Sequence, residues 1–154
     1  MAENEFAAFF EDAEPRLRRA LVAAYGPDEG REACAAALAY AWEHWDEVSA
    51  MSNPTGYLYR VGQSSRKPHN TPPPWLAGVA PATAAGPDVE PGLLPAMRDL
   101  TEHQRVSVLL VHGYGWTHDE VASMLGVGVS SVRNHLRRGL EHLRARLGEV
   151  AADA

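Results

Sequence analysis

Disulfide bonds and membrane spans are the first features that this sequence lacks. The chain of 154 residues has a single cysteine, Cys34, so it has no disulfide framework. Cys34 lies in an alanine-rich helical stretch, and we expect it to be a buried small apolar residue. No apolar run reaches the ~18 residues of a transmembrane helix, and the acidic N-terminus lacks the apolar core of a signal peptide. We therefore expect a soluble cytoplasmic protein that does not contact a membrane.

Catalytic and metal-binding patterns are also missing. The seven histidines are dispersed along the chain, and those in its C-terminal half do not have metal-ligand spacing. Paired carboxylates, a phosphate-binding loop and a nucleophile elbow are not found either. The sequence thus predicts no catalytic residue, no cofactor and no metal, and it disfavours an enzyme.

The alternation of apolar and polar residues that marks β-strands does not stand out. Apolar residues recur at helical spacing almost throughout, which predicts an all-α fold. Of the 11 prolines, 8 lie in residues 67–95, a run that is typical of an extended linker. We therefore expect two small helical domains, residues 1–66 and 93–148, joined by a proline-rich linker at residues 67–92.

Capping residues and prolines predict where the helices begin. Asp28, Asn53 and Thr101 are expected N-caps, and Pro15 is tolerated near the start of a second N-terminal helix. The expected helices cover about residues 6–22 (as one or two segments), 28–45, 54–65, 93–99, 102–112, 117–125 and 129–147.

Charge is unevenly distributed along this acidic chain, whose formal net charge is −6. Residues 1–66 hold 11 Asp and Glu against 6 Arg, whereas residues 128–147 hold 5 Arg against one Glu. A local basic stripe on an acidic protein indicates a targeted contact with DNA, with another surface reserved for a different partner.

Residues 117–146 have the layout of a helix-turn-helix. Thr117 and Glu120 fit a capping box at the start of the first helix, and Gly126 suits the left-handed turn that ends it. The second helix carries an apolar stripe that we expect to face the core. The stripe consists of Val132, Leu136, Leu140, Leu143 and Leu147.

Polar and basic side chains of the second helix lie off this stripe. The N-terminal residues of a recognition helix reach base edges, where Arg pairs with guanine and Asn with adenine. The alternative is an ordinary helical hairpin with a solvated basic face. The expected DNA-binding residues are Thr117, Ser130, Ser131, Arg133, Asn134, Arg137 and Arg138.

The same segment resembles the C-terminal DNA-binding domain of sigma-70 family sigma factors, of the small extracytoplasmic-function type. The resemblance extends from about residue 100 to residue 147 and implies that this domain binds the promoter −35 element. The residues that carry it are Gly115-Trp116-Thr117, Glu120-Val121-Ala122, Leu125-Gly126, Ser131-Val132-Arg133, Arg138-Gly139-Leu140 and Leu143-Arg144.

The first 66 residues are similar to the other conserved sigma domain, although they depart from its pattern in two places. The resemblance implies that this domain binds core RNA polymerase, with Glu32, Tyr40 and Glu43 as candidate contacts, and melts the −10 element. The polymerase-facing segment at residues 31–37 is rich in alanine, and Pro68 cuts short the last helix. Much of the −10 recognition surface is therefore expected to be missing.

Four aromatic residues of this first domain allow two interpretations, packing in the core and a role in promoter melting, and we favour packing. They are Trp42, Trp45, Tyr57 and Tyr59.

The sequence thus predicts a sigma factor that directs RNA polymerase to specific promoters. The alternative is a sigma-derived DNA-binding regulator that has lost promoter opening or polymerase binding. The expected partners are double-stranded promoter DNA, core RNA polymerase and, by resemblance, an anti-sigma factor. The promoter sequence, the inducing signal and the oligomeric state stay open.

Overall fold

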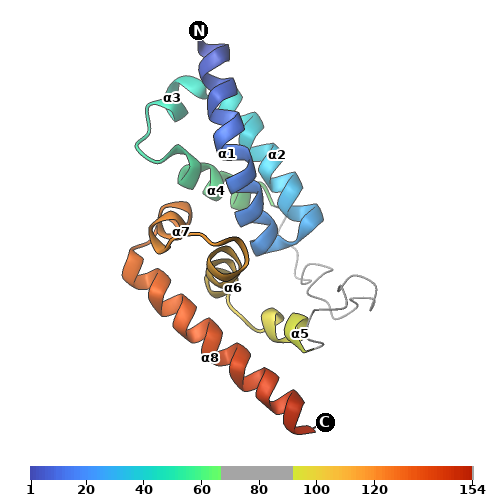
Figure 1. Cartoon of the computed structure of the whole chain (residues 1–154). Coiled ribbons are helices and arrows are strands. Elements are labelled where there is room, and N and C mark those ends of the chain that lie inside the picture. Colours follow the sequence, from blue (N-terminus) through green and yellow to red (C-terminus); the bar gives the residue numbers. More distant parts are fainter. Residues whose placement is uncertain (67–91, 154) are drawn as a thin grey trace.

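The computed structural model describes residues 1–66 and 92–153, and all regular structure in these ranges is helical (Figure 1). The prediction of an all-α fold is therefore confirmed. The expected linker at residues 67–92 lies, apart from its last residue, outside the described residues. Of the described helices, none is long and apolar enough to cross a lipid bilayer.

The chain begins with one long helix, α1 (Ala2–Tyr25), which passes through Pro15 without a break. Pro15 was expected near the start of a second helix, but it lies in the middle of a single one. A proline inside a helix removes one backbone hydrogen bond and costs about 3 kcal/mol. The buried face of α1, with Leu17 and Leu21 fully covered, compensates because tertiary packing supplies most of the stability of a helix in a protein.

The second helix, α2 (Pro27–Glu43), begins two residues earlier than the predicted N-cap implies. Its N-cap is Gly26 rather than Asp28, because Pro27 takes the first helical position, where its missing N–H costs nothing. Asp28 instead lies in the first turn, where its negative charge is favourable to the helix dipole. The short helix α3 (Trp45–Ser49) follows directly.

Helix α4 (Pro54–Ser65) has the predicted bounds and cap. The Asn53 side chain accepts a hydrogen bond from the backbone N–H of Gly56 at 3.1 Å. Helices α1, α2 and α4 pack against one another and form an N-terminal helical unit. Leu58 and Tyr59 of α4 are fully buried in it.

The C-terminal unit begins with α5 (Leu93–Arg98) and α6 (Glu102–Val108), and a complete Thr101–Gln104 capping box starts α6 as predicted. Beyond Val108 the predicted helix widens into a π-helical turn, η2 (Leu109–Gly113). It is followed by α7 (His118–Leu125) and the long α8 (Val129–Asp153), which continues beyond its predicted end at residue 147.

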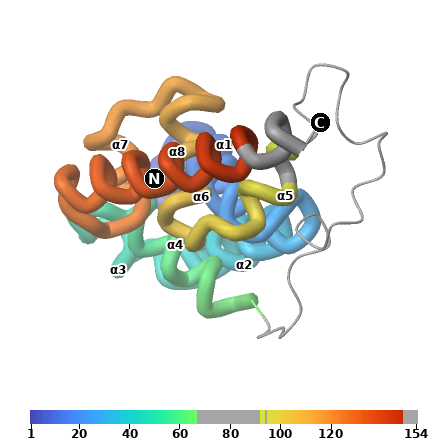
Figure 2. The backbone as a smooth tube through the Cα atoms, turned by 90° about the horizontal axis from the view of Figure 1, so that it is seen from below, coloured from blue at the N-terminus to red at the C-terminus, as the bar shows by residue number. Residues whose placement is uncertain are grey.

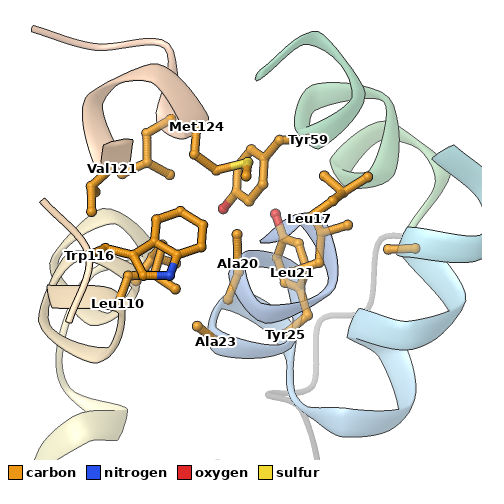
Figure 3. Close-up of a cluster of buried hydrophobic side chains, with 14 of the residues drawn as sticks. Leu17, Ala20, Leu21, Ala23, Tyr25, Tyr59, Leu110, Trp116, Val121 and Met124 are labelled. Atoms are coloured by element: carbon orange, nitrogen blue, oxygen red, sulfur yellow. The ribbon is translucent and has the colours of Figure 1, made fainter. Parts of the chain in front are cut away.

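A single hydrophobic cluster contains buried residues of both units. In Figure 3, Leu110, Trp116 and Met124 of the C-terminal unit face Ala20 of α1 and Tyr59 of α4. The views in Figures 1 and 2 show α6 and α7 beside the N-terminal helices and α8 on the outside. The two units thus bury apolar surface against each other, while their division into separate domains stays a proposal.

Candidate nucleic-acid interface

The first helix of the helix-turn-helix starts with the predicted capping box. The Glu120 N–H donates to Thr117 Oγ1 at 3.1 Å, and the Thr117 N–H donates to Glu120 Oε1 at 3.2 Å. The Thr117 hydroxyl also donates to Glu120 Oε1 at 3.0 Å. Thr117 is exposed, but its hydroxyl is already engaged in fixing the start of α7. Its role as a DNA contact stays a prediction.

The turn between α7 and α8 has the predicted left-handed glycine. Gly126 has φ 67° and ψ 35°, a conformation that a residue with a Cβ rarely adopts. The Val127 N–H then donates to the Ala122 carbonyl at 3.1 Å, which closes the end of α7. This turn sets the direction in which α8 leaves.

The predicted apolar stripe of α8 faces inward. Val132, Leu136 and Leu143 are buried, and Leu140 and Leu147 are half-buried. The stripe packs α8 against α6 and α7, so the opposite face of α8 is turned outward. The expectation that the stripe forms part of the core is confirmed.

The outward face of α8 presents the predicted DNA-binding side chains. Ser130, Arg133, Arg137 and Arg138 are exposed, and Ser131 and Asn134 are half-buried. These residues occupy the N-terminal half of α8, the part of a recognition helix that enters the major groove.

The arginines of this face have different surroundings. Arg137 donates from Nη2 to Asn134 Oδ1, and its Nη1 lies 3.7 Å from Glu141 Oε1. Within the part of the chain that the structure describes, no ion pair is found for Arg133 or Arg138. Arg137 is therefore positioned by two neighbours, and Arg133 and Arg138 keep their charge available for a ligand.

Two histidines flank this face, a pairing that sequence reasoning did not find. His103 of α6 and His135 of α8 lie with ring centroids 5.3 Å apart in an edge-to-face arrangement. Burial lowers the pKa of His135, and the nearby His103 and Arg138 lower it further. Because the two rings come from different helices, no local spacing in the sequence signals their contact.

A second missed contact braces α8 against α5. Asp99 lies 3.6 Å from His142 Nε2 and 3.3 Å from Arg146 Nε. The sequence shows that His142 and Arg146 share one face of α8, because they are spaced i, i+4. It does not show that both contact Asp99.

The candidate polymerase contacts share one face of α2. Residues 32, 40 and 43 are spaced by 8 and 3, so they lie close together around a helix of 3.6 residues per turn. Glu32 and Glu43 are exposed, and Tyr40 is half-buried with its hydroxyl 3.3 Å from that of Tyr57. Which of these residues binds a partner stays a prediction.

The four aromatic residues that the sequence singled out in the N-terminal unit differ in how deeply they are buried. Tyr59 is buried in the core, as we favoured, and Trp45 and Tyr57 are half-buried. The interpretation as core packing is wrong for Trp42, which is 50% exposed and meets Phe6 edge to face at 5.0 Å. Trp42 lies near the C-terminal end of α2, where its neighbour Phe6 belongs to the first turns of α1.

Trp42 also lines a groove of about 550 Å³ between α1 and α2, together with Phe6, Phe10 and Leu38. Cys34 also lines this groove; it is buried as predicted, and burial raises its pKa to about 11. The thiol is therefore neutral at physiological pH and packs as an apolar group. Among the described residues, no group of three or more His, Cys, Asp or Glu is placed to hold a metal ion.

Helices α7 and α8 with the glycine turn between them form a helix-turn-helix, the motif that in helical DNA-binding proteins places its second helix in the major groove. Residues 93–143 match the family described as sigma-70, region 4. Over 76 residues the chain is 35% identical to the RNA polymerase sigma factor CarQ of Myxococcus xanthus, a match that covers 47% of this chain and 44% of CarQ. The chain therefore spans less than half the length of that relative.

The whole fold is similar to that of the sigma factor RpoE of Bartonella quintana, whose structure was solved in complex with the anti-sigma factor NepR. The TM-score is 0.59 at 16% identity, and the likeness covers 94% of this chain and 97% of RpoE. The chain is thus similar to sigma-70 region 4 over residues 93–143, and it is similar in fold to a sigma factor along nearly its whole length.

Proposed function

We propose that this chain is an extracytoplasmic-function sigma factor that directs RNA polymerase to specific promoters, with α8 reading the −35 element. The observation that carries the proposal is the exposed N-terminal half of α8, which follows a capped α7 and a glycine turn inside the segment that matches region 4. Arg133 and Asn134 are the candidate base readers, because Arg and Asn recognise guanine and adenine through paired hydrogen bonds.

The N-terminal unit would bind core RNA polymerase. Glu32 and Glu43 offer exposed carboxylates on one face of α2, and Tyr40 lies on the same face. In this proposal the polymerase carries out catalysis, and the chain selects where transcription starts. The site of action would be the cytoplasm, where polymerase and DNA meet.

The proposal is tested with purified chain and core RNA polymerase. We expect the two to co-purify, and the complex to give run-off transcripts from a template that carries a sequence selected by the chain. The Arg133→Ala variant should keep polymerase binding and lose most transcripts. An absence of any complex between the chain and core polymerase would contradict the proposal.

A second candidate function is a DNA-binding regulator that has lost polymerase binding or promoter opening. It is favoured by the end of α4 at Ser65, after which Arg66 is extended, and by the exposed alanines Ala35 and Ala36 on α2. The same experiment separates the two candidates. A regulator would bind the selected DNA with full affinity and give no transcripts with core polymerase.

An anti-sigma factor is a further proposed partner. The support is that RpoE, which is similar in fold along nearly the whole chain, is bound to one in its structure. Affinity purification of the full chain from its host, followed by mass spectrometry, tests this. We expect an additional protein in stoichiometric amount beside or instead of polymerase subunits, and its absence under all growth conditions would contradict the proposal.

A further inference from the structure

Three polar side chains form a row on the outward face of α8. Asn134, Arg137 and Glu141 are spaced by three and four positions, so they follow one another along one side of the helix. Val132 and Leu136, which are buried, lie on the opposite side. Because the three polar residues belong to one helix, their arrangement does not depend on where the N-terminal unit lies.

The guanidinium of Arg137 connects the other two side chains. It donates from Nη2 to Asn134 Oδ1 at 2.5 Å, and its Nη1 lies 3.7 Å from Glu141 Oε1. Glu141 is the only acidic residue among residues 128–147, which hold five arginines. The one carboxylate of this basic stretch therefore lies beside the arginine that contacts Asn134.

The contact with Arg137 determines which way round the Asn134 amide is held. A guanidinium has only donors, whereas an amide has an oxygen that accepts and an NH2 group that donates. Arg137 therefore holds the amide oxygen, because a flipped amide would place two donor groups against each other. Within residues 1–66 and 92–153 no partner is found for Asn134 Nδ2, so this donor is available to a ligand.

An amide held in this way matches the edge of adenine in the major groove. Asn recognises adenine through two hydrogen bonds, one to N7 and one from the N6 amino group. The amide oxygen has two lone pairs, so Oδ1 can accept from Arg137 and from N6 at the same time. Ordering a side chain on binding weakens an interface by roughly two- to tenfold, and an amide that Arg137 already holds avoids this loss.

The surroundings of Arg137 favour such a role over a contact with phosphate. The Glu141 carboxylate partly neutralises the guanidinium and would repel a phosphate that approached it. The two side chains are 61% and 60% exposed, and a surface ion pair of this kind adds little to stability. Holding Asn134 accounts for the pair, whereas stabilising the fold does not.

We infer that Arg137, held by Glu141, is a positioning residue for Asn134, and that the three side chains together give a preference for adenine at one base pair. This step rests on the proposed reading of DNA by α8. A phosphate contact by Arg137 would instead strengthen binding to every sequence alike. The two roles therefore differ in what the loss of Arg137 does to base preference.

The test measures base preference with the full chain at one fixed salt concentration. Fluorescence anisotropy gives the affinity for a duplex that the wild-type chain selects from a random-sequence library, and for duplexes in which each base pair is replaced in turn. Asn134→Ala identifies the pair that Asn134 reads, as the one where a preference for adenine disappears. Arg137→Leu should lower that preference by roughly two- to tenfold and leave the preference at other pairs unchanged.

Three further variants make the result specific. Arg137→Lys keeps a donor and should retain part of the preference for adenine, and Glu141→Gln should lower it less than Arg137→Leu does. Combining Asn134→Ala with Arg137→Leu should give no lower preference at this pair than Asn134→Ala alone, because the two residues act as one unit. The control is Arg144→Leu, which removes a charge from an exposed position seven residues further along α8 and should keep every base preference.

The outcomes separate this inference from the proposed function. If Arg137→Leu weakens binding equally for all four bases at that pair, the inference is wrong and the reading of DNA by α8 stands. If Asn134→Ala removes no preference for adenine, the inference is also wrong, and Arg133→Ala still tests the reading of DNA by α8. If the wild-type chain selects no duplex at all, both fail.

Discussion

At the residue scale, the side chains around an arginine decide what that arginine is free to do. Arg137 is held by Asn134 and Glu141, whereas Arg133 projects from the exposed face of α8 one turn earlier. A base reader needs its hydrogen-bond donors available for a bidentate contact. Arg133 is therefore the better candidate for direct readout of a base. The side chain of Arg137 is already held in place by Asn134 and Glu141, which suits a contact of fixed geometry.

Replacing Arg133 tests this assignment. We expect Arg133→Ala to weaken binding to the selected duplex by about 1–3 kcal/mol and to relax the preference at one base pair. The fold should be unchanged, because the side chain is exposed. Binding is measured by fluorescence anisotropy on the selected duplex and on duplexes with single substitutions. An unchanged preference at every position would contradict the placement of the recognition helix.

The His103–His135 pair makes a prediction about pH. Since burial lowers the pKa of His135 below its usual 6.5, the folded state binds a proton less readily than the unfolded state. Stability is then fully present above about pH 6.5 and decreases as the pH falls below it, because the unfolded chain takes up the proton first.

We expect urea unfolding between pH 7.5 and pH 5.5 to show this loss and His135→Gln to reduce it. The exposed His112 provides the control, and His112→Gln should leave the pH dependence as in the wild type. Equal pH dependence in the wild type and in His135→Gln would show that this histidine does not titrate in the range.

At the element scale, local signals in the sequence determined the helix-turn-helix well. Capping boxes act over three residues and the apolar stripe over one helix, so Thr117, Gly126 and Leu136 were assigned correctly from neighbours alone. The failures have a common cause. The continuity of α1 through Pro15 and the exposure of Trp42 depend on which helix packs against which, and no local pattern contains that information.

The same limit applies to the candidate site. The basic face of α8 follows from helical spacing, whereas the pairing of His103 with His135 and the contact of Asp99 with Arg146 join residues that are 32 and 47 positions apart. Contacts of this kind are set by how the helices pack together, and a single sequence does not specify that packing.

The glycine at the α7–α8 turn gives a test at this scale. Gly126 has a positive φ, so Gly126→Ala should strain the turn and destabilise the protein by about 1 kcal/mol or more. Gly113 is the matched control, because its φ is not positive and a Cβ there meets nothing within 4 Å. Thermal unfolding of both variants measures the difference. Equal effects at the two positions would contradict a special conformation at Gly126.

At the scale of the whole molecule, one hydrophobic core and the buried Arg105 connect the two units. The guanidinium donates to three backbone carbonyls, two on α1 and one, that of Leu100, before α6. Burial lowers the pKa of Arg105, and the negative charge of Glu102 acts in the opposite direction by raising this pKa. An arginine stays charged after such a shift because its usual pKa is so high.

Removing this guanidinium should uncouple the units. For Arg105→Leu we expect a loss of about 3 kcal/mol or more, since each buried carbonyl left without a donor costs about 1–3 kcal/mol. Arg16→Leu, a change at a surface ion pair with Asp12, should cost no more than about 0.5 kcal/mol. Urea unfolding followed by circular dichroism measures both. A cost at position 105 as small as that at position 16 would contradict the role of Arg105 in joining the units.

The place of Trp116 has a consequence for how the molecule can be observed. Its indole is 7% exposed and faces Ala20 of the other unit, so it senses water as soon as the units separate (Figure 3). Trp42 and Trp45 lie on the outer side of the N-terminal unit, away from this junction. In a chain that keeps Trp116 as its sole tryptophan, a red shift of fluorescence emission would report the opening of the molecule, in real time and without a label.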